Sequence, residues 1–395
     1  MDKNIRKFQL PSHGKLKKAQ KEILRLPESE EILITGGPGT GKSVVSLMRR
    51  LTHSENQNYI FLVYNKVLLL STKQMVEGNV NGSTWKKWLN ITFEELTSKE
   101  IPKKPIDSNK NDFREIDFDK TILKIQEFFK DRDFPSHELN FIIDEGQDMP
   151  PKFYEALYEM GYKNFFVVAD QNQQITDLNS IIRELKEVLN VDKIYKLTEN
   201  FRNSFEIAVL AQQFYADTAT EPPALPEPEP EVKLPPTLFD YEDSDDAFIS
   251  LNKRILKTSD TNPSDLIGIF TFSNPTRLKY LNTLRDSDIK REHPKPIIST
   301  YSSNDFSPKI DFSRGGIVVL NSASVKGLEF DVVFIADIDE FNKKPSIDAL
   351  KKIFYVMTSR SIKKLFLLRN KGHRRHTKLD DILPTDEDIL KRSSL

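Results

Sequence analysis

Cysteine is absent from this chain of 395 residues. Its absence excludes disulfides, thiol catalysis, cysteine-ligated zinc sites and iron–sulfur clusters, and it favours a reducing compartment. An excess of charge of either sign is missing too, because the formal net charge is −1. The chain as a whole therefore has no bulk attraction to a polyanion, and any nucleic-acid site must come from local basic clusters.

Long apolar runs are also lacking. No stretch approaches the roughly 20 residues that cross a bilayer, and the opening segment MDKNIRKFQLPSHG has no apolar core of the kind found in signal peptides. We therefore expect a cytoplasmic protein. With 38% hydrophobic and 30% charged residues the chain has an ordinary globular composition, and its length allows two domains.

A glycine-rich segment, Gly36-Gly37-Pro38-Gly39-Thr40-Gly41-Lys42-Ser43, follows the apolar run Ile32–Ile34 and precedes a helical pattern from Val44 to Leu51. It matches G-x-x-x-x-G-K-[ST] at every fixed position. Backbone N–H groups and the positive end of the following helix would cradle phosphates there. Lys42 would reach the outer phosphates and the Ser43 hydroxyl would hold Mg²⁺. The segment predicts that the chain binds a nucleoside triphosphate through Gly36, Gly37, Gly39, Thr40, Gly41, Lys42 and Ser43.

Short apolar runs recur along the chain, with helical patterns or turns between them. They are rich in Val, Ile and Phe and lack strict alternation, as strands buried on both faces of a parallel sheet do. We predict an α/β fold with two parallel sheets, one in each half of the chain. The runs are Ile32–Ile34, Tyr59–Tyr64, Phe141–Ile143, Phe165–Val168, Ile194–Leu197, Leu266–Phe272, Ile317–Leu320, Val332–Ile335 and Leu365–Leu368.

Two stretches interrupt this rhythm. Residues 91–136 are polar and charged around one amphipathic segment, Ile122–Phe129, and indicate an insertion in the first domain. Residues 221–236, EPPALPEPEPEVKLPP, alternate proline with glutamate. Because proline fixes φ and neighbouring glutamates repel each other, we predict an extended surface strap. A docking peptide for a partner is the alternative.

An acidic cluster, Asp144-Glu145-Gly146-Gln147-Asp148, follows the apolar run Phe141–Ile143. A carboxylate at the end of a strand beside a phosphate loop can hold Mg²⁺, which assigns Asp144 to the metal together with Ser43. Glu145 is then placed to accept a proton from an attacking water. Such a base indicates hydrolysis and not transfer to a second substrate. An acidic turn after a core strand is the alternative.

The pentapeptide DEGQD resembles the D-E-x-Q-D of superfamily 1 helicases of the UvrD/Rep/PcrA type, and further segments similar to that family's motifs follow in its order. The resemblance covers nearly the whole chain. It implies two RecA-like domains with ATP between them and 3′→5′ movement along single-stranded DNA. The other matching segments are KKAQKEIL, Tyr64-Asn65-Lys66, Thr84-Trp85, Ala169–Gln173, Leu197–Arg202, Val325–Asp331 and Tyr355–Arg360.

The resemblance also implies roles for single side chains. Gln20 would read adenine and Phe201 would stack on the base, while Gln173, Arg202 and Arg360 would contact the γ-phosphate. Two arginines, a lysine and a metal around one γ-phosphate would neutralise the charge that develops in phosphoryl transfer. Further residues implied at the nucleotide are Gly327 and Glu329, and those implied at the nucleic-acid strand are Tyr64, Asn65, Thr84, Trp85 and Asn321.

The chain departs from the family pattern where nucleic acid is bound. About thirty residues separate Leu284 from Gly315, too few for the 2B subdomain of larger members. An aromatic residue that usually follows Gln173 is missing, and Asn321 and Ala323 replace a threonine and a histidine. Trp85 and Trp88 flank two lysines, which is the composition of a base-stacking platform. Core packing is the alternative for both tryptophans and for Tyr64.

We therefore predict a RecA-like domain over residues 1–199, with a small insertion at about 67–136, and a second over 200–395 that carries the strap. The leading function is an ATP- and Mg²⁺-dependent translocase or helicase on single-stranded DNA. RNA remains an alternative, since stacking and phosphate contacts do not read the sugar. A second hypothesis is a nucleic-acid-stimulated ATPase in a repair or antiviral defence complex with a partner nuclease. A third, a non-catalytic nucleotide-binding scaffold, would not need Glu145.

Overall fold

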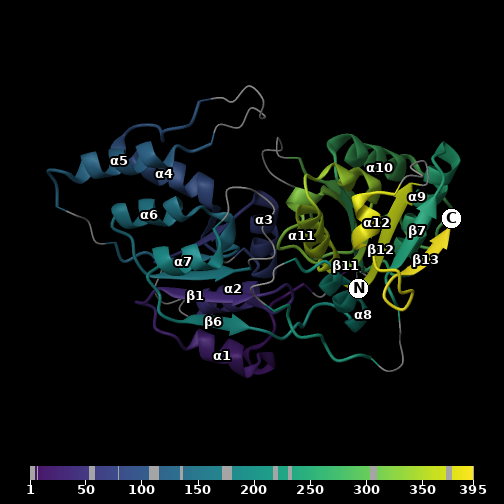
Figure 1. Ribbon diagram of the computed structural model, residues 1–395, viewed down its shortest axis with the longest axis horizontal. Coiled ribbons are helices and arrows are strands. Elements are labelled where there is room, and N and C mark those ends of the chain that lie inside the picture. Colours follow the sequence, from purple (N-terminus) through teal and green to yellow (C-terminus); the bar gives the residue numbers. More distant parts are fainter. Residues whose placement is uncertain are drawn as a thin grey trace.

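The computed structural model describes residues 5–6, 8–52, 58–78, 80–105, 115–133, 137–170, 180–216, 221–229, 234–302, 309–370 and 376–394. Within these ranges the chain forms two α/β units, each built on a parallel sheet (Figure 1). The prediction of two parallel sheets, one in each half, is confirmed. No helix of the described ranges is both long and apolar enough to cross a membrane.

The first unit contains a six-stranded sheet in the order β3-β2-β4-β5-β1-β6, and each neighbouring pair is parallel. Every residue of β2 and β5 is buried, because helices cover both faces of the sheet, and this explains why the runs lack alternation. The strands are β1 (Ile32–Gly36), β2 (Tyr59–Val63), β3 (Gly82–Thr84), β4 (Asn140–Ile143), β5 (Phe165–Ala169) and β6 (Ile194–Leu197).

Helices pack on both faces of this sheet and enclose two apolar clusters. α4, α5 and α6 lie on one side and α1 on the other (Figure 1). The helices are α1 (Lys18–Leu24), α2 (Lys42–Thr52), α3 (Lys66–Met75), α4 (Trp85–Thr97), α5 (Phe118–Phe129), α6 (Pro151–Glu159) and α7 (Ile182–Val188). The stretch 67–136 that the sequence predicts to be an insertion includes β3, which pairs with β2, and α4, whose Leu89 and Phe93 are fully buried. β3 therefore belongs to the sheet of the first unit, and α4 belongs to the helices that pack on it.

The second unit contains a seven-stranded sheet in the order β13-β7-β12-β11-β8-β10-β9, again with parallel pairs. Its strands are β7 (Thr237–Tyr241), β8 (Leu266–Thr271), β9 (Ile298–Thr300), β10 (Gly316–Asn321), β11 (Phe330–Ile335), β12 (Ser361–Asn370) and β13 (Lys391–Ser394). Its helices are α8 (Phe205–Gln213), α9 (Asp245–Thr261), α10 (Asn274–Asp286), α11 (Ile347–Thr358) and α12 (Lys378–Ile382).

The described part of the N-terminal segment lies against the second unit, although the segment leads into the first. Ile5 forms a bridge with Arg314, and the Arg6 Nε donates to Asp331 Oδ2 at 2.7 Å inside the protein. The next helix, α1, packs on α2 of the first unit. The segment thus ties the two units together. The predicted domain boundary at residue 199 places this segment in the first domain and did not include its contact with the second.

Candidate functional site

The phosphate loop connects β1 to α2 at the carboxyl edge of the first sheet. Gly39 and Gly41 have φ values of +75° and +86°, which residues with a side chain rarely adopt. A Cβ on Gly39 would also lie 2.1 Å from Asn200 Oδ1, and one on Gly41 would lie 2.3 Å from Gln20 Nε2. The glycines are therefore required by the backbone and by the close neighbours on both sides of the loop.

Lys42 begins α2, and its ammonium is held within the loop. The Nζ donates to the carbonyls of Gly36 and Gly37 at 2.6 and 2.8 Å, and it lies 3.5 Å from Asp170 Oδ2. Thr40 Oγ1 donates to the same Gly37 carbonyl at 2.8 Å. These contacts concentrate positive charge at the point where the loop would meet phosphate oxygens.

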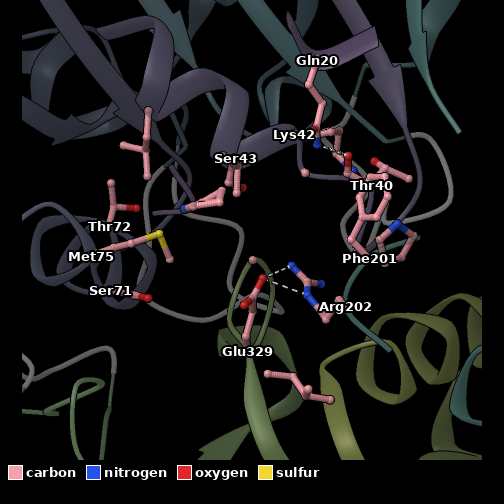
Figure 2. A pocket seen from close by; sticks show the side chains of 18 of the residues that line it. Gln20, Thr40, Lys42, Ser43, Ser71, Thr72, Met75, Phe201, Arg202 and Glu329 are labelled. Atoms are coloured by element: carbon pink, nitrogen blue, oxygen red, sulfur yellow. Dashed lines mark hydrogen bonds and ion pairs between the residues drawn. The ribbon is translucent and has the colours of Figure 1, made fainter. Parts of the chain in front are cut away.

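Gln20 and Phe201 lie beside the loop, near Thr40 and Lys42 (Figure 2). Gln20 Nε2 donates to the Thr40 carbonyl at 3.3 Å, and its Oε1 accepts from the Lys17 backbone N–H at 3.0 Å. Phe201 is held by its N–H, which donates to the Gly39 carbonyl at 2.9 Å, while its ring is 47% exposed. A hydrogen-bonding amide and an exposed ring at one end of a phosphate loop are suited to contact a nucleobase.

Three carboxylates are buried in the turn that follows β4. Burial and the neighbouring Glu145 raise the pKa of Asp144 to about 6, although a hydrogen bond with Ser43 acts in the opposite direction. Burial also raises the pKa of Asp148 to about 7, against the attraction of Lys326. For Glu145, burial is outweighed by the charges of Lys326, Lys42 and Arg360, which hold its pKa below the ordinary value. Of the three, Glu145 is the one whose pKa is lowered.

Asp144 and Ser43 have the chemistry of a magnesium site. Their side chains hydrogen-bond to each other, and Asp144 Oδ2 is buried without a hydrogen-bond partner in the part of the chain that the structure describes. A free carboxylate oxygen beside a hydroxyl suits Mg²⁺, which takes few protein ligands and completes its shell with phosphates and water. The described ranges contain no group of three or more His, Cys, Asp or Glu residues that could hold a metal. A magnesium ion here would therefore depend on phosphates and water for its other ligands.

The second unit contributes Arg202, Glu329 and Arg360. The Arg202 Nε and Nη2 donate to Glu329 Oε1 at 2.8 and 2.5 Å, and this arginine outweighs the effect of burial and lowers the pKa of Glu329. Arg360 is 1% exposed, and its Nε donates to the Val356 carbonyl at 3.0 Å. Burial, with repulsion by Arg202, lowers the pKa of Arg360 to about 10, so that it stays cationic at neutral pH.

These groups line one cavity of about 410 Å³ between the two units, within the size range of small-ligand sites (Figure 2). Lys42, Ser43 and Glu145 face it from the first unit, and Arg202 and Arg360 face it from the second. The other predicted nucleotide-site residues along its wall are Gln20, Gly37, Gly39, Thr40, Gly41, Phe201, Gly327 and Glu329. Gln173 lies outside the described residues.

Residues 20–179 match the family model of an AAA domain. The matched residues include the phosphate loop and the acidic turn after β4. No curated protein matches the chain. Among solved structures, one match is the C-terminal domain of a possible DNA helicase from Lactobacillus plantarum WCFS1, with 16% identity and a TM-score of 0.33. The match covers 48% of this chain and 97% of that one, and a likeness of this size carries no argument here.

Two contacts around the P-loop were not predicted. Pro223 of the proline-rich strap lies against the loop, since a Cβ on Gly37 would approach its Cγ to 2.0 Å. The second is an ion pair in which Lys326 Nζ donates to Asp148 Oδ1 at 2.6 Å. Both partners of this pair lie in motif segments of the sequence, but their separation of 178 residues gives no signal that they meet.

Trp85 is a core residue, so of the two alternatives left open by the sequence the structure supports core packing over a face for base stacking. Its side chain is 4% exposed and packs against Phe118 and Phe153, with ring centroids 6.3 and 5.2 Å away. Trp88 makes edge contacts with Phe141 and Tyr162. The core alternative applies to both tryptophans, because α4 turns its apolar face to the sheet.

Three of the other residues predicted at the strand are partly or wholly engaged within the protein. Asn65 Oδ1 caps α3 by accepting from the Leu68 N–H at 2.8 Å. Asn321 Oδ1 accepts from Thr271 Oγ1 at 3.0 Å, and its Nδ2 donates to Asn274 Oδ1 at 2.7 Å. Tyr64 is half-buried against the core of the first unit, and burial raises its pKa. Thr84 precedes α4 without a side-chain cap bond.

This packing predicts that tryptophan emission does not report nucleic-acid binding. The chain has two tryptophans. Trp85 is buried, and Trp88 is partly buried with its ring against Phe141 and Tyr162, so neither offers a free face for a base. Added single-stranded DNA should leave the emission spectrum unchanged, and acrylamide should quench the native protein far less than the protein unfolded in guanidinium. DNA-induced quenching that disappears in Trp85→Phe would contradict the core placement.

Proposed function

We propose that this chain hydrolyses ATP with Mg²⁺ and uses the cycle to move along a single strand of DNA, in the manner of a superfamily 1 helicase. One observation carries the proposal. The cavity joins the P-loop lysine and a buried, ionised glutamate of one unit to two arginines of the other. A scaffold that only bound nucleotide would need neither that glutamate nor the arginines.

The proposed chemistry assigns one task to each side chain. Glu145 accepts a proton from water as the water oxygen bonds to the γ-phosphorus, and the bond to the bridging oxygen breaks so that ADP leaves with that electron pair. Lys42, Arg202 and Arg360 neutralise charge on the transferred group. Ser43 and Asp144 would hold Mg²⁺, which would supply positive charge beside the nucleotide phosphates.

The arrangement also provides for movement. Because cations from both units would contact one triphosphate, ATP would hold the units together. Loss of the γ-phosphate would remove the negative charge that attracts Arg202 and Arg360. Glu329 already pairs with Arg202 and offers that arginine a partner when no phosphate is present. Alternate closing and opening would then advance a strand bound across both units. The 3′→5′ direction rests on the family resemblance alone.

A second candidate is an ATPase subunit that is stimulated by nucleic acid and works with a partner nuclease in DNA repair or antiviral defence. The observation that favours it concerns the strand contacts: Trp85 is buried, and Asn65 and Asn321 are engaged by their own neighbours. Most of the residues proposed at the nucleotide line one cavity, whereas several proposed at the strand are buried or bonded within the protein. RNA as the strand remains part of the proposal, and so does a cytoplasmic location.

Steady-state ATPase activity tests the proposed function directly. The purified chain with Mg²⁺ should turn over ATP, and single-stranded DNA should raise the rate more than blunt duplex of the same length, with single-stranded RNA as the third arm. A rate that no nucleic acid changes would count against the translocase, and equally against stimulation by nucleic acid in the second candidate. No hydrolysis under any of these conditions would contradict the enzyme assignment.

Removal of the proposed base should separate binding from turnover. In Glu145→Gln we expect ATP affinity within about threefold of the parent and kcat lowered by roughly 10²- to 10⁴-fold, the usual contribution of a general base. Nucleotide binding is followed with a fluorescent ATP analogue and turnover by phosphate release. Glu155→Gln, on the exposed side of α6, is the matched control and should retain full activity. Near-parental hydrolysis by Glu145→Gln would rule out Glu145 as the base.

Loss of a proposed γ-phosphate arginine should slow hydrolysis more than it weakens binding. We expect Arg360→Ala to lower kcat by about 10³-fold, the lower end of the range for arginines that stabilise phosphoryl transfer, with a much smaller change in ATP affinity. Arg202→Ala, at a more exposed position, serves if the buried variant does not fold. Arg183→Ala on the surface of α7 is the control. A kcat equal to that of the parent in all three variants would mean that neither Arg202 nor Arg360 takes part in catalysis.

A further inference from the structure

A buried lysine of the second unit reaches the acidic turn of the first. Lys326 lies between the short 3-10 helix η4 (Ser322–Ser324) and β11, and it is 2% exposed. Its Nζ donates to Asp148 Oδ1 at 2.6 Å and lies 3.8 Å from Glu145 Oε2. Both carboxylates belong to the turn after β4, so this pair of contacts crosses from one unit to the other.

The backbone beside Lys326 is built for this close approach. Gly327 has φ of +75°, and a Cβ there would lie 2.7 Å from Leu68 Cδ1 of α3, in the first unit. Val325 and Leu328 are fully buried in the core of the second unit. The segment is thus anchored on its own sheet while its glycine touches the opposite unit, which brings the lysine to the carboxylates.

The contacts divide the two oxygens of Glu145. Oε2 accepts from Gln147 Nε2 at 2.7 Å and is the oxygen that faces Lys326. This leaves Oε1 as the oxygen available to a water in the cavity, which Glu145 lines. Gln147 is itself fixed, because its Oε1 accepts from the Asp170 N–H at 2.9 Å. The first unit therefore supplies one of the two groups at Oε2, and the second unit supplies the other.

The burial of both carboxylates makes the loss of their contacts with Lys326 costly. Glu145 and Asp148 are 3% and 4% exposed, and a buried carboxylate without a counter-charge is strongly disfavoured. Lys326 lies within ion-pair distance of both, while the ion pair of Lys42 is made with Asp170. Withdrawal of the second unit would leave the acidic turn without its nearest cation.

We propose that Lys326 is a positioning residue for hydrolysis: it binds Asp148 and Glu145 Oε2 from the second unit and so orients the glutamate only when the units are together. This inference rests on the proposed function, in which Glu145 is the base. It adds a condition to that function. The base would be assembled by the same closure that brings Arg202 and Arg360 to the phosphate, so that ATP bound to an open form would not be hydrolysed.

A mutant cycle tests the inference. Lys326→Met removes the charge and keeps an unbranched side chain, and Asp148→Asn removes its main partner. We expect Lys326→Met to lower kcat about tenfold or more, with KM for ATP within about threefold, because the group acts on the step after binding. The double variant should lose no more than Lys326→Met alone, since contacting residues that act as a unit are not additive.

The matched control is Lys363→Met. Lys363 also pairs with two aspartates, Asp265 and Asp331, at 2.6 and 3.0 Å, but wholly within the second unit and with its side chain 52% exposed. It should leave kcat unchanged. Parental kcat in Lys326→Met, an equal fall in Lys363→Met, or losses that multiply in the double variant would each overturn the inference. If Lys326→Met does not fold, Asp148→Asn is compared with the control in the same way.

Hydrogen–deuterium exchange separates this inference from the proposed function, because it requires no hydrolysis. Amide exchange over residues 144–148 should rise in Lys326→Met and not in Lys363→Met. If the parent protein hydrolyses no ATP, the proposed function fails while the exchange result still stands. Exchange that is unchanged in Lys326→Met would then overturn the positioning role.

Discussion

The structure depends on burying opposite charges at the boundary between two α/β units. Lys326 of the second unit pairs with Asp148 and Glu145 in the acidic turn of the first. Lys42 and Arg202 pair with carboxylates inside their own units. At the boundary, Lys42, Glu145 and the two arginines line a single cavity. Isolated buried charge is costly and paired charge is tolerated. The same requirement therefore holds the units in register and prepares a site for a polyanionic ligand.

The two sheets explain why these charges meet. In a parallel sheet every strand ends at the same edge, so the P-loop after β1 and the acidic turn after β4 lie close together even though β5 runs between their strands. In the second unit, Arg360 comes directly before β12 and Lys326 shortly before β11. Segments outside the sheets reinforce the arrangement: the N-terminal segment binds the second unit through Arg6, and Pro223 lies against the P-loop. A change in the ligand at the cavity would consequently be felt by both units.

Features that depend on a short stretch of sequence, such as strands and loop motifs, were mostly predicted. All nine apolar runs coincide with strands, and the glycine-rich loop and the acidic turn follow β1 and β4 as expected from the sequence. Strands β3, β7, β9 and β13 were missed: β3 and β9 are three residues long, and β13 reads Lys-Arg-Ser-Ser with no buried residue. Trp85 was left open because spacing alone does not say whether a helix face meets the core or a strand of nucleic acid. The ion pair between Lys326 and Asp148 could not be predicted, since it depends on how two separately folded units dock.

The central claim is that ATP is bound between the units and draws them together. It can be measured by electron–electron distance spectroscopy, because the chain has no cysteine. Spin labels can be placed at Leu123→Cys on α5 and Leu278→Cys on α10, which are 57% and 46% exposed. In the hydrolysis-deficient Glu145→Gln background, the account predicts one narrow distance distribution with Mg²⁺ and ATP and a broader or displaced one with ADP or without nucleotide. Identical distributions in all three states, with nucleotide binding verified, would contradict it.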